Sequence, residues 1–153
     1  MRTSKSWVSL LWMALAVATT AVRAEDPQVL RDLEAKNPRK LSKEEVTQLL
    51  PGAKMSRVSE RGNTHYWTNE ADGSFVISSD NRGANSMVSS NRSSTAQGKW
   101  HISDDGRYCV LIEWRSVPTE EWCRFILETT DGYYGVRSES VGTERVHKLQ
   151  IKK

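Results

Sequence analysis

Beyond Gly52 the chain alternates apolar and polar residues in short runs, and this two-residue period is typical of half-buried β-strands. Asp-Gly pairs at 72–73, 105–106 and 131–132 separate several of these runs. Asp-Gly favours type I′ hairpin turns, because both central residues of that turn need positive φ. The pattern predicts a mainly β fold with strands at about 53–59, 64–69, 74–79, 97–103, 107–115, 121–130, 133–138 and 146–151.

Strands that follow one another through hairpins form an antiparallel meander. The predicted meander is eight-stranded, and such a sheet most simply closes into an up-and-down, lipocalin-like barrel, because closure removes the exposed edges. A two-layer sandwich is the alternative arrangement.

The segment before Gly52 has the spacing of a short N-terminal helix. Ser42 to Glu45 form a capping-box pattern, in which the serine hydroxyl accepts a hydrogen bond from the backbone N–H three residues on. Pro51 and Gly52 end this helix. We expect residues 25–40 to be a partly helical extension and residues 41–153 to form the barrel domain.

Two cysteines, Cys109 and Cys123, fall in adjacent predicted strands. A hairpin centred on residue 116 places them opposite each other, where two Cβ atoms lie near disulfide range. We therefore predict a disulfide that closes a loop of about 15 residues. In the chain-entropy model, closing such a loop stabilises the folded state by about 3 kcal/mol. The alternative is a reactive thiol, against which the spacing argues because it is not Cys-x-x-Cys.

The first 24 residues have the pattern of a signal peptide. Arg2 and Lys5 precede a mostly apolar run at residues 7–18. A run of about twelve residues is short for a membrane span and suits a signal-peptide core. We expect cleavage after Ala24 and a periplasmic or secreted location, with an uncleaved membrane anchor as the alternative.

Removal of this leader changes the charge of the chain. The whole sequence has 22 Lys and Arg residues against 19 Asp and Glu residues. The leader contains three bases, Arg2, Lys5 and Arg23, and no acid, so the mature chain is formally neutral. A neutral chain gives no electrostatic reason to expect a nucleic-acid partner. No second apolar run is long enough to cross a membrane.

The aromatic residues of the predicted barrel all fall in or beside strands, where most of them are expected to pack in the core. A barrel of this size can also hold one small ligand inside. Trp67, Trp100 and Trp114 are the candidates for lining such a site. The expected ligand is a small apolar molecule or a component of the cell envelope.

Candidate catalytic and metal-binding residues are few. His65, His101 and His147 are scattered, and neither cysteines nor carboxylates surround them with zinc-site spacing. We therefore expect no metal and no cofactor. The sequence also lacks a nucleophile elbow and a phosphate loop, so an enzyme would have to use His65 or His101 beside a carboxylate.

The stretch from Asp80 to Thr95 is polar and rich in serine and asparagine, which predicts a long loop between two strands. Loops of this length are either functional or disordered.

Several segments resemble one known family. They are Leu49–Gly52, Trp67–Phe75, Ser79–Gly83, Gly98–Cys109 and Glu121–Arg124. Together they are similar to the DUF995 family of small exported bacterial proteins, a domain of unknown function, over about residues 41–151. The resemblance implies bacterial export, a β-rich domain and a paired cysteine. It implies no catalytic residues.

Three hypotheses for the function follow. The first is a non-catalytic ligand-binding or interaction module, with the ligand inside the barrel. The second is a protein-binding barrel that resembles lysozyme inhibitors, with Asp80–Thr95 as a protruding finger. The third is an uncharacterised enzyme with a histidine and a carboxylate in a polar cleft.

Overall fold

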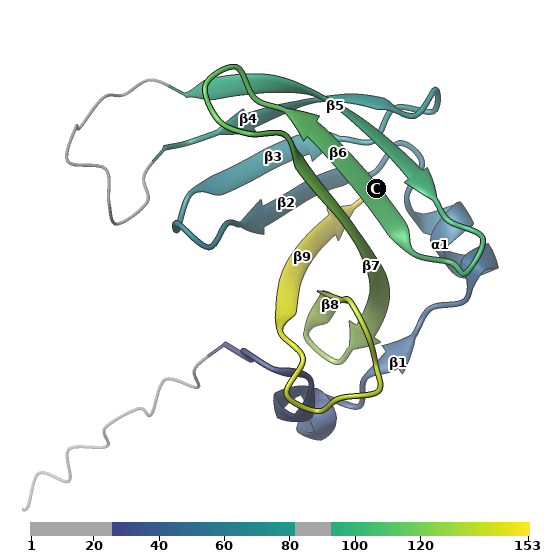
Figure 1. The fold of residues 1–153 in the computed structure, drawn as a ribbon. Coiled ribbons are helices and arrows are strands. Elements are labelled where there is room, and N and C mark those ends of the chain that lie inside the picture. The colour runs from purple at the N-terminus through teal and green to yellow at the C-terminus, as the bar shows by residue number, and fades with distance from the viewer. Residues whose placement is uncertain (1–25, 82–92) are drawn as a thin grey trace, which may run out of the picture.

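The strands of the computed structural model close into a barrel (Figure 1). The structure describes residues 26–81 and 93–153. Each strand of the barrel pairs antiparallel with its neighbour in the chain, and the first barrel strand pairs with the last to complete the ring. The barrel strands are β2 (Lys54–Val58), β3 (Thr64–Thr68), β4 (Ser74–Ser79), β5 (Ser94–Ile102), β6 (Tyr108–Glu113), β7 (Glu120–Thr129), β8 (Gly132–Val136) and β9 (Val146–Lys152).

This architecture confirms the predicted eight-stranded meander barrel and excludes the sandwich. Two of the Asp-Gly turns carry glycine at φ 85°, at Gly73 and Gly106, in the left-handed region that these hairpins require. β5 begins at Ser94, about three residues before its predicted start. The predicted signal peptide and most of the predicted loop, residues 82–92, lie outside the described residues.

The helix α1 (Lys43–Leu49) lies at one end of the barrel, near the turn between β5 and β6 (Figure 1). Its predicted capping box is present: Ser42 Oγ accepts from the Glu45 backbone N–H at 3.2 Å, and Glu45 Oε2 accepts from the Ser42 N–H at 2.8 Å. Val46 and Leu50 are fully buried, so the helix closes this end of the barrel with apolar side chains.

Apolar side chains fill the half of the barrel that adjoins α1. Phe75 and Tyr108 are among the largest fully buried members. The buried residues of this core are Leu41, Val46, Leu50, Ala53, Met55, Trp67, Phe75, Ile77, Ala96, Tyr108, Val110, Ile112, Ile126 and Leu149.

One hydrogen-bonded network lies inside this core. Trp67 Nε1–H donates to Asn69 Oδ1 at 3.1 Å and to the Tyr108 hydroxyl at 3.0 Å. The Tyr108 hydroxyl donates to Asn69 Oδ1 at 2.7 Å, and the Asn69 amide donates to the carbonyl of Leu50 at 3.2 Å. Burial raises the pKa of Tyr108. The polar atoms of the network are thus satisfied, and they connect the end of α1 to β3 and β6.

A second apolar cluster lies on the outside of the barrel. The extension forms a 3₁₀-helix, η1 (Leu30–Lys36), and a two-residue strand, β1 (Arg39–Lys40), that pairs with β7. Leu33 of η1 is fully buried against the outward faces of β7, β8 and β9. The cluster comprises Leu33, Leu127, Tyr134, Val136 and Val146. The extension is therefore packed against the outside of the barrel.

The predicted disulfide between Cys109 and Cys123 is present. The two residues are direct partners in the register of β6 and β7, with a Cα–Cα distance of 4.0 Å. The bridge joins two strands inside one hairpin.

We predict that Cys123→Ser lowers the free energy of unfolding by about 2–5 kcal/mol, because the unfolded chain regains the conformational freedom of the closed loop. Urea unfolding of the oxidised protein and of the variant measures this difference. Reduction of the wild type should give the same loss. A variant as stable as the oxidised parent would contradict a stabilising role for the bridge.

Gly98 on β5 is opposite Phe75 on β4, and the phenyl ring lies over the glycine. A Cβ at position 98 would overlap that ring. We predict that Gly98→Ala costs about 1–3 kcal/mol of stability, as overpacking of a core does. Gly142→Ala is the control, because its Cβ would make only an ordinary contact, 3.6 Å from Arg31. Equal melting temperatures for the two variants would contradict this packing.

Candidate functional site

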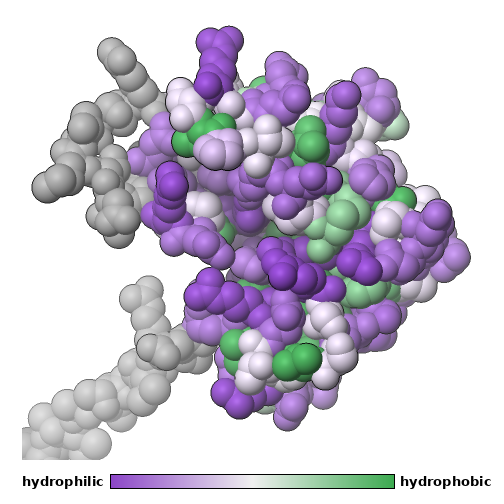
Figure 2. Space-filling model, viewed as in Figure 1, coloured by the Kyte–Doolittle hydropathy of each residue, from purple (hydrophilic) through white to green (hydrophobic). Residues whose placement is uncertain are grey.

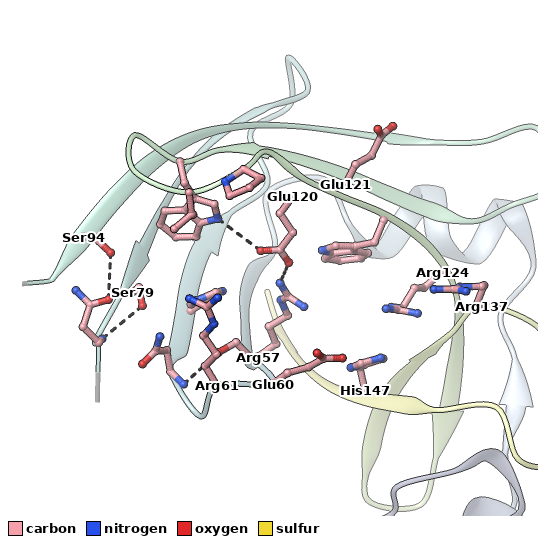
Figure 3. A pocket seen from close by; sticks show the side chains of 18 residues that line it. Arg57, Glu60, Arg61, Ser79, Ser94, Glu120, Glu121, Arg124, Arg137 and His147 are labelled. Atoms are coloured by element: carbon pink, nitrogen blue, oxygen red, sulfur yellow. Dashed lines mark hydrogen bonds and ion pairs between the residues drawn. The ribbon is translucent and has the colours of Figure 1, made fainter. Parts of the chain in front are cut away.

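The end of the barrel opposite α1 is open and holds a cavity of about 530 Å³. Its rim is formed by the β2–β3 and β6–β7 turns and by the ends of β4, β5 and β8. Figure 2 shows strongly hydrophilic side chains around a hollow in this part of the surface. Figure 3 shows the side chains that line it. We call this cavity the mouth.

The mouth exists because several strands change from apolar to polar residues along their inward face. On β2, Met55 lies in the apolar core and Arg57, two residues on, lines the mouth. On β3, likewise, Trp67 lies in the apolar core and His65, two residues before it, lines the mouth. Residues two apart on a strand share a face, so these polar side chains lie inside the barrel rather than on its surface.

Arg57 is the most buried of the cations that line the mouth, with 9 % of its side chain exposed. Its guanidinium forms an ion pair with Glu120 of β7, across the interior of the barrel. Its Cζ lies 5.2 Å from the centre of the Trp122 ring, within the range of a cation–π contact. The Arg57 Nε atom is buried and has no hydrogen-bond partner among the described residues.

His65 is 6 % exposed and lies against the ring of Trp114, with 5.3 Å between ring centres. Burial, and then the positive charge of Arg57, lower the pKa of His65. The imidazole is therefore neutral at pH 7 and offers one N–H donor and one acceptor. Its Nδ1 atom is buried without a hydrogen-bond partner in the described part of the chain.

Trp122 lies in the wall of the mouth, between two arginines. Its ring contacts Tyr108 edge-on at 5.5 Å, and the Arg57 and Arg124 guanidinium carbons lie 5.2 Å and 5.9 Å from its centre. Its indole Nε1–H is buried, and no described residue accepts from it. The mouth thus contains three buried polar atoms without partners, on Arg57, His65 and Trp122.

Arg124 and Arg137 add positive charge to the mouth (Figure 3). The stem of Arg124 lies over Gly135, where a Cβ would come within 3.0 Å of Arg124 Cδ. Burial, and then the charges of Arg57 and Arg137, lower the pKa of Arg124. Neither Arg124 nor Arg137 has an ion-pair partner within residues 26–81 and 93–153.

His147 of β9 also lines the mouth. Burial, and then the charges of Arg124 and Arg57, lower the pKa of His147 to about 4. This imidazole is therefore also neutral at pH 7.

The structure separates the three tryptophans that were predicted to bind a ligand. Trp114 lines the mouth, where its Nε1–H lies 3.5 Å from Glu120 Oε2. Trp67 belongs to the apolar core. Trp100 packs against that core and donates from Nε1 to the carbonyl of Glu70 at 2.9 Å. Only Trp114 of the three lies at this cavity, and its role in binding remains a prediction.

The histidines are also in different surroundings. His101 is exposed on β5, whereas His65 and His147 are in the mouth. Neither His65 nor His101 makes a hydrogen bond to a carboxylate of the described residues. In the same part of the chain no group of three or more His, Cys, Asp or Glu residues is arranged to hold a metal ion.

The sequence interpretation missed the charged residues of the mouth, among them Arg57, Arg124 and Arg137. It also left Glu120 just outside the strand predicted at about 121–130, whereas Glu120 begins β7 and pairs with Arg57. The signal was present in the alternation: Arg124 precedes Ile126 by two residues, so it had to share that inward face.

Comparisons with known proteins identify a family. The family model described as Protein of unknown function (DUF995) matches residues 8–123, which confirms the resemblance, although the resemblance was expected over about residues 41–151. No curated protein and no solved structure is significantly similar to the chain. Arg57, His65 and Trp122 lie inside the match, and Arg124 and His147 lie beyond it.

No helix in the described ranges is long and apolar enough to cross a membrane.

We predict that stability falls between about pH 6.5 and pH 4, because His147 binds a proton in the unfolded chain near its ordinary pKa of 6.5 but in the folded barrel only near 4. Over that range the unfolded state binds more protons, so lower pH favours unfolding. His147→Gln removes this contribution and should lose less stability than the wild type on acidification. Thermal unfolding at about pH 7.5 and about pH 5 measures the difference.

The control is His101→Gln on the exposed face of β5, which should keep the pH dependence of the wild type. The account of His147 is contradicted if both glutamine variants lose as much stability on acidification as the parent.

Proposed function

The chain belongs to the family described as Protein of unknown function (DUF995), and from the geometry of its barrel we propose that it is a non-catalytic binding protein, which holds a small molecule in the mouth. The proposal extends to export: the leader pattern of residues 1–24 and the disulfide both suit a periplasmic or secreted protein.

The observation that carries this proposal is the set of three unpartnered buried atoms in one cavity, Arg57 Nε, His65 Nδ1 and Trp122 Nε1. A buried polar group without a hydrogen bond costs about 1–3 kcal/mol. A fold that keeps three such groups in one place is more stable when a guest supplies their partners. The groups come from β2, β3 and β7, so the closed barrel sets their positions.

The dimensions of the mouth agree with this proposal. Cavities for small ligands generally have volumes of about 300–1,000 Å³, and the mouth has about 530 Å³. The other half of the barrel is filled by the apolar core, so a ligand would enter only the half between that core and the rim. The mouth also differs from the expected apolar cup, because charged side chains form much of its lining.

We predict that the protein purified from its own host carries a small molecule that native mass spectrometry detects as added mass. Ser79→Phe should abolish this added mass, because Ser79 is buried, lies on the inward face of β4 and lines the mouth. Ser78→Phe is the matched control, because the adjacent residue points to the other face of the same strand.

Both variants are first checked by thermal unfolding for a cooperative transition. Added mass in the wild type and in Ser78→Phe, but not in Ser79→Phe, supports binding in the mouth. Added mass that Ser79→Phe retains, or only the bare protein mass in all three, contradicts it.

A further inference from the structure

We propose that the ligand of the mouth is a small organic anion, whose oxyanion group is bound by Arg124 and Arg137 and whose apolar body lies against the β6–β7 turn. This inference rests on the proposed function and names the class of ligand.

The charge balance of the mouth favours an anion as its ligand. The lining of the mouth contains four arginines, Arg57, Arg61, Arg124 and Arg137, and three glutamates, at positions 60, 120 and 121. Glu120 pairs with Arg57, and Glu60 Oε1 lies 3.3 Å from Nη1 of the exposed Arg145. Glu121 is exposed and points away from the cavity in Figure 3. With His65 and His147 neutral, the positive charges of the lining outnumber the negative ones by one.

Arg124 and Arg137 supply that positive charge, and no carboxylate in the described ranges pairs with either of them. Burial, and then the charges of Arg57 and of the exposed Arg137, lower the pKa of Arg124, whereas Glu144 and Glu60 act in the opposite direction. The neighbouring cations therefore repel one another. An anion bound between them would remove this repulsion. Guanidinium groups bind carboxylate, phosphate and sulfonate oxygens with paired hydrogen bonds.

Arg124 is also held in position without a ligand. Gly135 leaves room for its stem, and the Trp122 ring lies 5.9 Å from its guanidinium carbon. A side chain that is already ordered loses less entropy when it binds. This packing distinguishes Arg124 from a surface arginine, which would be free to move.

Part of the remaining surface of the mouth is apolar. The β6–β7 turn contributes Trp114, Val117 and Pro118 to the lining, and Val117 is 46 % exposed. These apolar groups gain little from a bare inorganic anion, but they can bury the hydrocarbon part of an organic one. His65 and Trp122, whose Nδ1 and Nε1 atoms are buried without hydrogen-bond partners among the described residues, belong to the same lining.

Two fluorescent probes with the same rings differ in whether they carry an anionic group. 8-Anilinonaphthalene-1-sulfonate carries a sulfonate, and N-phenyl-1-naphthylamine has the same ring system without it. We predict that the disulfide-bonded protein binds the sulfonate probe at least about tenfold more tightly, because the neutral probe has no group that accepts hydrogen bonds from the guanidinium groups. Fluorescence titration gives both dissociation constants.

The double variant Arg124→Gln and Arg137→Gln should reduce the preference for the sulfonate to about twofold or less, since the neutral side chains no longer attract the anion. Arg31→Gln is the control, because it removes a positive charge from η1, outside the mouth, and should leave the preference unchanged. Near-ultraviolet circular dichroism confirms that each variant keeps its tertiary structure.

The outcomes separate this inference from the proposed function. If both probes bind equally and Ser79→Phe blocks both, the mouth binds ligands but does not select anions, and the inference is wrong. A sulfonate preference that survives in the double variant also overturns it. If Ser79→Phe leaves the binding of both probes unchanged, the proposed function itself fails.

Discussion

Closure of β2 to β9 into a hydrogen-bonded ring is the constraint on which the rest of the structure depends. In a closed barrel every second residue of every strand points into one shared interior. That interior is divided lengthwise: near α1 it is filled by apolar side chains, and toward the rim it is lined by charged and polar ones. The barrel therefore contains an apolar core at the end next to α1 and a cavity at the opposite end.

The polar half is stable because its charges are partly compensated inside the barrel. Arg57 and Glu120 face each other from β2 and β7, and Trp122 lies against Arg57. Such a pair offsets the cost of removing charge from water only when its geometry is good. The compensation is incomplete, since Arg124 and Arg137 lack carboxylate partners in the described residues and three buried polar atoms have no hydrogen bond. We infer that this incompleteness is functional, because a ligand of opposite charge would complete the network.

The sequence predicts the barrel well and its mouth poorly, for a physical reason. Alternation and Asp-Gly turns are local signals, and the hairpin register that joins Cys109 to Cys123 is local too. The mouth depends on which side chains meet across the barrel. An arginine that points inward, such as Arg124, looks the same in the sequence as an arginine exposed to solvent. For the same reason Trp67 and Trp114 looked equivalent in the sequence, although one lies in the core and the other at the cavity.

The most direct test of the central claim is a crystal structure of the protein with 8-anilinonaphthalene-1-sulfonate. The account predicts the dye inside the mouth, with its sulfonate within hydrogen-bond distance of Arg124 or Arg137 and its rings against Trp114. A dye bound only on the outer surface, with the mouth occupied by ordered water, would contradict the account.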